Sequence, residues 1–340
     1  MTFTSVSSRE GLDELLERLA GRYRVDPDQI IPFVDHTDML SGLLRHLAGG
    51  RRRMIVAGYA SPEIALAADR CELAITEVTG ASPFVNHPED VLEALTSEDD
   101  LVYLANPNWV TGAGYSFNHL DTIIRALPKG RVILDEKLHD YFGITGLSLL
   151  DTYDHLAILR SLSVGLDFGF EGGCLLASPR VTAEFRQVLP WMKIRSRELA
   201  LLADCLADKH KAEDRLTRAH DQSFYLATEL NELDVQNRLT SADFVLLRVA
   251  QPSKVSNYLA SLGLPTENLE GYEGLDNYLR YRTDRPDLNE QLLTAFRRMP
   301  TGYYRMDDVD RRAVMFHRTE SQKILSSEHK PTSENRLVAS

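Results

Sequence analysis

Cysteine is scarce in this chain of 340 residues, which contains only Cys71, Cys174 and Cys205. Three scattered cysteines are too few for a disulfide framework or a cysteine-based zinc cluster, and they are typical of a reducing compartment. No apolar run approaches the roughly 18 residues of a membrane span, and the first residues lack the layout of a signal peptide. We therefore expect a cytoplasmic protein with no membrane partner.

Positive charge is also in short supply, since 38 Lys and Arg residues face 50 Asp and Glu residues and give a formal net charge of −12. A chain this acidic repels nucleic acid and anionic lipid, so no nucleic-acid partner is expected. The sequence lacks HExxH and paired CxxC motifs, the GxSxG turn and the phosphate-loop lysine motif. No metal site is therefore expected.

Helical and strand patterns alternate from about residue 36 to residue 200. Strands separated by helices are typical of a mainly parallel sheet covered by helices on both faces, so the predicted class is α/β. Ligands of such sheets bind beyond the carboxyl ends of the strands. The predicted strands lie within residues 51–59, 73–78, 100–108, 131–136, 156–162 and 172–179.

Four segments divide the chain by pattern. We expect a helical segment over residues 1–30, a large domain over 31–235 and a small α+β domain over 236–300. Residues 301–340 are polar and poorly periodic, which predicts a surface arm or a disordered tail.

Four motifs follow one another along the chain: Asn106–Gly112 (NPNWVTG), Val132–Glu136 (VILDE), Leu159–Ser163 (LRSLS) with Gly172-Gly173, and Tyr278–Arg280 (YLR). In this order they resemble fold type I aminotransferases, which use pyridoxal phosphate, and in particular the histidinol-phosphate branch. The resemblance covers roughly residues 25–300. It implies a large domain with a seven-stranded, mainly parallel sheet and a small α+β domain that residues 1–30 join. It also implies a homodimer.

Two functional positions of this family are retained. The resemblance places Asp135 where the family has the aspartate on the pyridine nitrogen, and Arg280 where it has the arginine that binds the substrate carboxylate. Only arginine supplies the bidentate geometry for that contact. An amino-acid-like ligand at Arg280 is therefore expected.

Other positions depart from the family pattern. The lysine that carries the cofactor as a Schiff base falls on Val164, which has no amine. Trp109 and Leu138 replace the two residues that hold the ring oxygen. Glu171 replaces the phosphate-binding arginine, an unfavourable exchange of a cation for an anion. These departures predict a degenerate large domain that binds no cofactor.

Three further residues are expected near the ligand. The aromatic residue that stacks on the ring falls near Ser61, and Tyr59 is the alternative for that role. Trp109 and Asn108, in the turn after a strand, are expected to border the ligand together with Tyr59. His36 lies where the family's phosphate-binding turn opens a helix, and we interpret it as a helix-cap or surface residue.

Lys137 replaces the small alanine that lies under the cofactor ring. One interpretation is a salt-bridged lysine that fills a disused pocket, and the other is a relocated amine that attacks a carbonyl. In the second interpretation, the former cofactor crevice would be refitted for another reaction and would use the acids and bases near Lys137. Its candidate catalytic residues are Lys137, Asp135, Asp167, Glu171 and His139.

Three functions follow from these residues. The first is a catalytically degenerate aminotransferase homologue, a dimer that binds an amino-acid-like molecule or supports a partner enzyme. The second is an unusual or cofactor-independent enzyme of amino-acid-derived metabolism in the refitted crevice. The third, weakest alternative is a pyridoxal-phosphate-dependent aminotransferase that uses Lys137. Fold alone does not decide between them, because function depends on the site.

Overall fold

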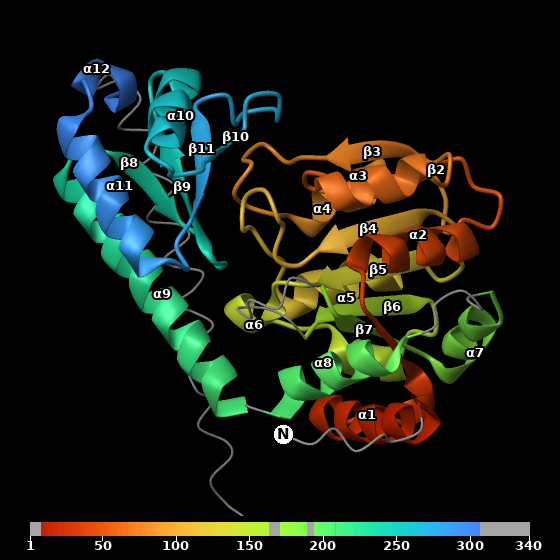
Figure 1. Cartoon of the computed structure of the whole chain (residues 1–340). Helices are drawn as coiled ribbons and strands as arrows, with labels where there is room; N and C mark the ends of the chain where they lie inside the picture. Colours follow the sequence, from red (N-terminus) through yellow and green to blue (C-terminus); the bar gives the residue numbers. More distant parts are fainter. Residues whose placement is uncertain (1–7, 163–170, 189–193, 208, 307–340) are drawn as a thin grey trace, which may run out of the picture.

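A seven-stranded sheet forms the large domain of the structure, a computed structural model that describes residues 8–162, 171–188, 194–207 and 209–306 (Figure 1). The strand order is β1-β7-β6-β5-β4-β2-β3. Neighbours from β3 to β6 run parallel, whereas β7 is antiparallel to both β6 and β1. The predicted α/β class is confirmed. The strands are β1 (Ile30–Phe33), β2 (Arg53–Ala57), β3 (Ala74–Val78), β4 (Leu101–Ala105), β5 (Arg131–Glu136), β6 (Leu156–Ser161) and β7 (Gly173–Ala177).

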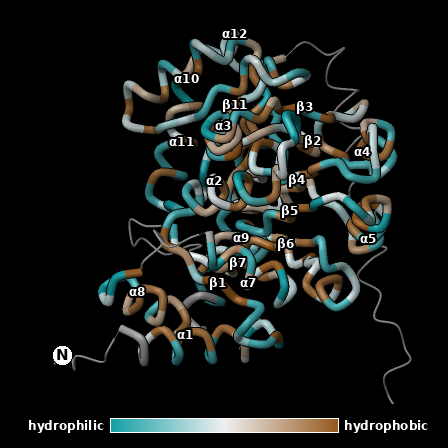
Figure 2. Tube along the Cα trace, turned by 90° about the vertical axis from the view of Figure 1, so that its right-hand side faces the viewer, coloured by the Kyte–Doolittle hydropathy of each residue, from teal (hydrophilic) through white to brown (hydrophobic). Residues whose placement is uncertain are grey.

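Helices cover both faces of this sheet, as the apolar strands require. All residues of β4 are buried: Val102 and Leu104 face one hydrophobic cluster, and Leu101 and Tyr103 face another. Figure 2 shows α4 and α5 on one side of the strands and α2 on the other. The first cluster includes α1 (Ser8–Tyr23), α4 (Pro88–Ala94), α5 (Phe117–Arg125) and α8 (Ser196–Ala207), and the second includes α2 (His36–Leu47), α3 (Pro62–Asp69) and α7 (Pro179–Val188).

An antiparallel sheet of order β10-β11-β9-β8 forms the small domain. Along β9, Val245 and Leu247 pack on the helices of this domain, whereas Phe244 and Leu246 belong to a cluster shared with the large domain. The alternation places one face of β9 toward the large domain. The elements are α9 (Lys209–Glu232), β8 (Gln236–Leu239), β9 (Phe244–Arg248), α10 (Pro252–Ser261), β10 (Glu267–Asn268), β11 (Tyr278–Arg282), α11 (Pro286–Arg298) and α12 (Thr301–Tyr304).

The N-terminal segment differs from the expectation that it joins the small domain. Leu15 and Leu19 of α1, one helical turn apart, are buried in the same cluster as Leu199 and Leu202 of α8. This apolar stripe explains why α1 packs beside the large sheet (Figure 1). Residues 30–33 form β1, an edge strand that the sequence did not predict.

Two reversals of direction, from β6 to β7 and from β7 to β1, make β1 parallel to β5. The segments that follow β1, β2 and β5 therefore leave the sheet at the same edge. The helix α6 (His139–Phe142) and the short 3-10 helices η1 (Pro27–Gln29) and η2 (Leu147–Asp151) complete the connections. Among the residues that the structure describes, no helix is long and apolar enough to cross a membrane.

Candidate functional site

Three strand ends bring charged side chains to one edge of the large sheet. Asp135 lies near the end of β5, and His36 opens α2 shortly after β1. Asp35 caps α2 by accepting a hydrogen bond from the Asp38 amide at 2.7 Å, which fixes where the helix starts. Glu63 lies in the first turn of α3, which follows β2.

Asp135 is the centre of this site, and only 5% of it is exposed. Its Oδ2 accepts a hydrogen bond from the Tyr103 hydroxyl at 2.6 Å and lies 3.1 Å from His36 Nε2. Its Oδ1 accepts one from the Lys137 amide at 2.9 Å. Burial raises the pKa of Asp135, but the charge and contact of His36, together with the hydrogen bonds from Tyr103 and the Lys137 amide, outweigh burial and hold the pKa below its usual value. Asp135 is therefore a carboxylate.

His36 is the cationic partner of Asp135. The side chain is buried, and its Nδ1 lies 3.3 Å from Glu63 Oε2. Burial lowers the pKa of His36, but the charge of Asp135 and the contacts with Asp135 and Glu63 outweigh it and raise the pKa to about 9. His36 is thus an imidazolium inside the site, and the interpretation of it as a cap or surface residue is wrong.

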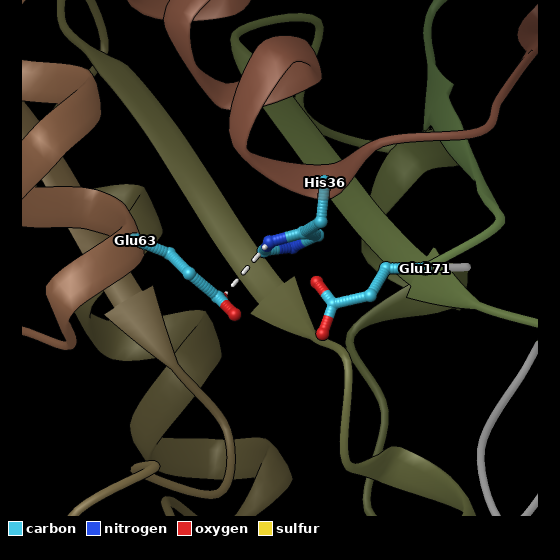
Figure 3. Close-up of side chains that lie close together, drawn as sticks. All are labelled: His36, Glu63 and Glu171. Atoms are coloured by element: carbon cyan, nitrogen blue, oxygen red, sulfur yellow. Dashed lines mark ion pairs between the residues drawn. The ribbon is translucent and has the colours of Figure 1, made fainter. Parts of the chain in front are cut away.

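Lys137 connects two further acids. Its Nζ donates to Glu63 Oε1 at 2.8 Å and to Glu171 Oε2 at 3.0 Å. Burial lowers the pKa of Lys137, but the charges of Glu63 and Glu171 outweigh it and raise the pKa. The side chains of His36, Glu63 and Glu171 point toward a common centre in Figure 3.

The charges of this cluster nearly balance, with two cations, His36 and Lys137, against three carboxylates. Ligand atoms of His36, Glu63 and Glu171 lie within 4.8 Å of one another, a spacing that could hold a metal ion. The Lys137 ammonium already bridges the two glutamates, so it supplies the positive charge that a metal would bring. The absence of a metal stays a prediction.

The cavity in front of Asp135 is small. Its volume is about 20 Å³, room for about one water molecule. It is lined by Ser61, Glu63, Tyr103, Ala105, Pro107, Trp109, Asp135, Lys137 and Leu138.

Arg280 lies beyond Trp109, on β11 of the small domain. Its guanidinium carbon lies 4.0 Å from the centre of the Trp109 ring and 4.2 Å from that of Phe244, so the cation is stacked between two aromatic rings. Its Nη1 donates to Glu267 Oε2 at 3.0 Å. Burial lowers the pKa of Arg280, and the bond to Glu267 acts against this. The Glu267 carboxylate thus already binds Arg280, the arginine that was predicted to bind the carboxylate of the ligand.

Tyr59 and Asn108 link the turns that follow β2 and β4 to each other and to the small domain. The Tyr59 hydroxyl donates to the Glu273 carbonyl in the small domain. Asn108 Nδ2 donates to the Tyr59 carbonyl at 2.9 Å, and its Oδ1 accepts from the Val110 amide at 3.0 Å. Gly58 precedes them with φ +82°, where a Cβ would lie 3.0 Å from Asn108 Nδ2. These bonds position the turn, and neither residue lines the cavity.

His139 is not brought into the cluster. Its Nδ1 lies 3.1 Å from the Ile144 carbonyl oxygen, and burial and the charge of Arg160 lower its pKa to about 4. Arg160 forms a buried ion pair with Glu136 at 2.6 Å. Of the other predicted catalytic residues, the structure joins Asp135, Lys137 and Glu171. Val164 and Asp167 lie outside the described residues.

The sequence prediction missed His36, Glu63 and Tyr103 as members of the site. Recognition of β1 would have placed His36 at the carboxyl edge of the sheet, since His36 follows that strand by three residues. Tyr103 is a polar-tipped residue inside an otherwise apolar strand, which is the remaining signal.

Comparison with known proteins places the chain in a family. The family model for aminotransferase class I and II matches residues 1–267. The histidinol-phosphate aminotransferase of Chlorobaculum tepidum is 24% identical over 280 residues, which cover 81% of this chain and 80% of the relative. The corresponding enzyme of Caldanaerobacter subterraneus is 28% identical over 203 residues, or 58% of this chain and 56% of the relative.

Solved structures share the fold. The histidinol-phosphate aminotransferase from Clostridium acetobutylicum superposes with a TM-score of 0.77 at 16% identity, over 86% of this chain and 90% of that chain. The histidinol-phosphate aminotransferase from Sinorhizobium meliloti, in complex with pyridoxal-5'-phosphate, superposes with a TM-score of 0.75 at 16% identity. The match covers 85% of this chain and 83% of that chain.

These relatives correct the expectation about the cofactor. The family and the neighbour solved with pyridoxal-5'-phosphate point to this cofactor, so the expectation of no cofactor is wrong. In the present arrangement the residues do not fit it, because the cavity holds about one water and His36 contacts Asp135. An approaching pyridine ring would have to displace His36. The predicted resemblance itself is confirmed, and the chain belongs to the aminotransferase class I and II family.

Proposed function

We propose that this chain is a catalytically degenerate aminotransferase homologue that binds an amino-acid-like molecule between its two domains. In this proposal pyridoxal phosphate is not carried on a lysine. The observation that supports it is the double ion pair of Lys137 with Glu63 and Glu171.

An amine attacks an aldehyde only when it is unprotonated and has a free lone pair. The two glutamates raise the pKa of Lys137 and hold its ammonium form. Residue 164, aligned by resemblance with the lysine of the family, is a valine. Both facts favour the interpretation of Lys137 as a salt-bridged residue over that of a relocated amine.

The ligand's carboxylate is proposed to bind Arg280. The stacked guanidinium is held rigidly and is only 9% exposed, so little entropy is lost when it binds an anion. Glu267 holds the same guanidinium, and it is itself half-buried at the rim. The carboxylate of the ligand would replace Glu267 as the ion-pair partner of Arg280.

The test is chemical trapping. The protein is incubated with pyridoxal phosphate, reduced with borohydride and digested, and the peptides are analysed by mass spectrometry. We expect labelling at Lys137 no higher than at Lys129, an exposed surface lysine that controls for non-specific reaction. Preferential labelling of Lys137 would overturn the proposal and favour an aminotransferase that uses this lysine.

Ligand binding is tested separately. A thermal-shift screen of amino acids and keto acids should raise the melting temperature of the wild-type protein for some members. Arg280→Ala should abolish the shift. An unchanged shift in this variant would remove Arg280 from the proposal.

The proposal includes assembly as a homodimer, which the resemblance implies, or support of a partner enzyme. Sedimentation of the purified chain should give twice the mass of a 340-residue monomer. A monomer at micromolar concentration would contradict the homodimer.

A further inference from the structure

Among the described residues, three groups contact the two carboxylate oxygens of Asp135. Tyr103 and His36 contact one oxygen, and the Lys137 amide contacts the other. His36 brings a flat aromatic ring with a cationic N–H to this carboxylate. A protonated pyridine ring offers the same chemistry: an aromatic ring with one cationic N–H donor.

His36 is tethered next to Asp135, because Asp35 fixes the start of α2 and His36 is its first residue. A tethered group acts at a high effective concentration compared with a free ligand. Only the fraction of molecules in which His36 has left Asp135 can bind a competitor, and the apparent affinity falls by that fraction.

We propose that the His36 side chain and a pyridinium-type ligand such as pyridoxal phosphate exclude each other at Asp135. The chain thereby carries its own occupant of the cofactor position, which must move before the cofactor binds. This inference goes beyond the proposed function, because the cavity at Asp135 is lined by residues of the large domain, whereas Arg280 lies on β11 of the small domain. The exclusion affects how tightly pyridoxal phosphate binds at Asp135 and involves no covalent bond to the chain.

The experiment measures binding of pyridoxal phosphate by equilibrium dialysis to the wild-type protein, His36→Ala and His46→Ala. His46 lies on the same helix but pairs with Glu184, 3.7 Å away on α7, so it is a matched control. We expect His36→Ala to bind at least tenfold more tightly than wild type, and His46→Ala to bind like wild type. Adding Asp135→Asn to His36→Ala should remove the gain.

A second measurement needs no variant. Nitrogen NMR of the imidazole follows His36 in the wild-type protein, where contact with Asp135 keeps it protonated well above neutral pH. Saturation with pyridoxal phosphate should return its titration to that of an ordinary histidine. This readout stands even if His36→Ala fails to fold.

Three results would overturn the inference: equal or weaker binding in His36→Ala, bound ligand with the His36 signals unchanged, or no binding to either protein at millimolar ligand. Its failure is distinct from that of the proposed function. Borohydride trapping on Lys137 contradicts the latter, whereas a gain of affinity in His36→Ala supports the inference whatever the trapping result.

Discussion

His36 and Asp135 form a buried ion pair whose members are exposed by 2% and 5%. Removing one partner of such a pair leaves an uncompensated charge, at a cost of about 3–5 kcal/mol in the free energy of unfolding. We expect this loss for His36→Ala in urea denaturation. His46→Ala, which removes a half-exposed pair, should cost less than about 1 kcal/mol. Equal losses in the two variants would contradict the ion pair at Asp135.

The raised pKa of His36 makes stability depend on pH. Its pKa is about 9 in the folded protein, against 6.5 for an unperturbed histidine such as that of the unfolded chain. The contribution of the imidazolium is therefore complete below about pH 6.5 and is lost as the pH rises through 9. We expect the free energy of unfolding to fall over this range in wild type and to fall less in His36→Ala. Parallel curves for the two proteins would contradict the assignment.

Glu267 accepts a hydrogen bond from the Arg280 guanidinium, where it would compete with the carboxylate of a ligand. Glu267→Gln keeps the shape of the side chain but removes the charge that competes for the guanidinium. We expect carboxylate ligands to bind about 3- to 10-fold more tightly, since an ion pair whose glutamate is partly exposed contributes about 1 kcal/mol. Glu270→Gln is the control, because Glu270 bonds Ser253 and Asn268 instead. Calorimetry of the same ligands measures both, and equal affinities would exclude Glu267 as the competitor.

At the scale of elements, the sequence predicted six of the seven strands of the large sheet because each is a short and mainly apolar run. The edge strand β1 escaped prediction because it has only four residues and contains Pro32, which lacks a donor and is tolerated at sheet edges. Antiparallel pairing with β7, far along the chain, stabilises it, and no local pattern encodes that contact.

The candidate site was predicted only in part for a related reason. Asp135 and Lys137 are close in the sequence and stand out at a strand end. His36 contacts Asp135 from the start of α2, and Glu63 contacts Lys137 from the start of α3. Both contacts depend on how these two helices pack against the sheet, which the local sequence does not show. Helix-start patterns predict a cap, but they do not predict which way the first side chain points.

The helix α3 offers a test of how an element positions the site. Ser61 Oγ accepts a hydrogen bond from the Ile64 amide and caps this helix, which carries Glu63. Ser61→Ala should cost about 1 kcal/mol. Ser116→Ala removes the equivalent cap of α5 at a similar cost. Only Ser61→Ala should change the NMR titration of His36, because α3 carries Glu63, which contacts His36. A change in both variants would mean that loss of overall stability, and not the position of Glu63, alters the titration.

At the scale of the whole molecule, a shared apolar cluster joins the two domains beside the site. Phe244 is fully buried in it and stacks on Arg280. Phe244→Ala should cost about 3–5 kcal/mol and weaken ligand binding at Arg280. Phe296→Ala, in the core of the small domain, should cost as much stability without the binding defect. Loss of binding in both variants would indicate that global stability, not the stacking, controls the ligand.

The position of β1 has a consequence for synthesis on the ribosome. Its strand partner in the described sheet is β7, and the chain makes β2, β3, β4, β5 and β6 before that partner emerges. Long-range pairing of this kind is slow, because the loop must close before the contact forms. The backbone hydrogen bonds of Ile30 and Ile31 to β7 can therefore form only after five intervening strands have been made, so this edge of the large sheet is completed late.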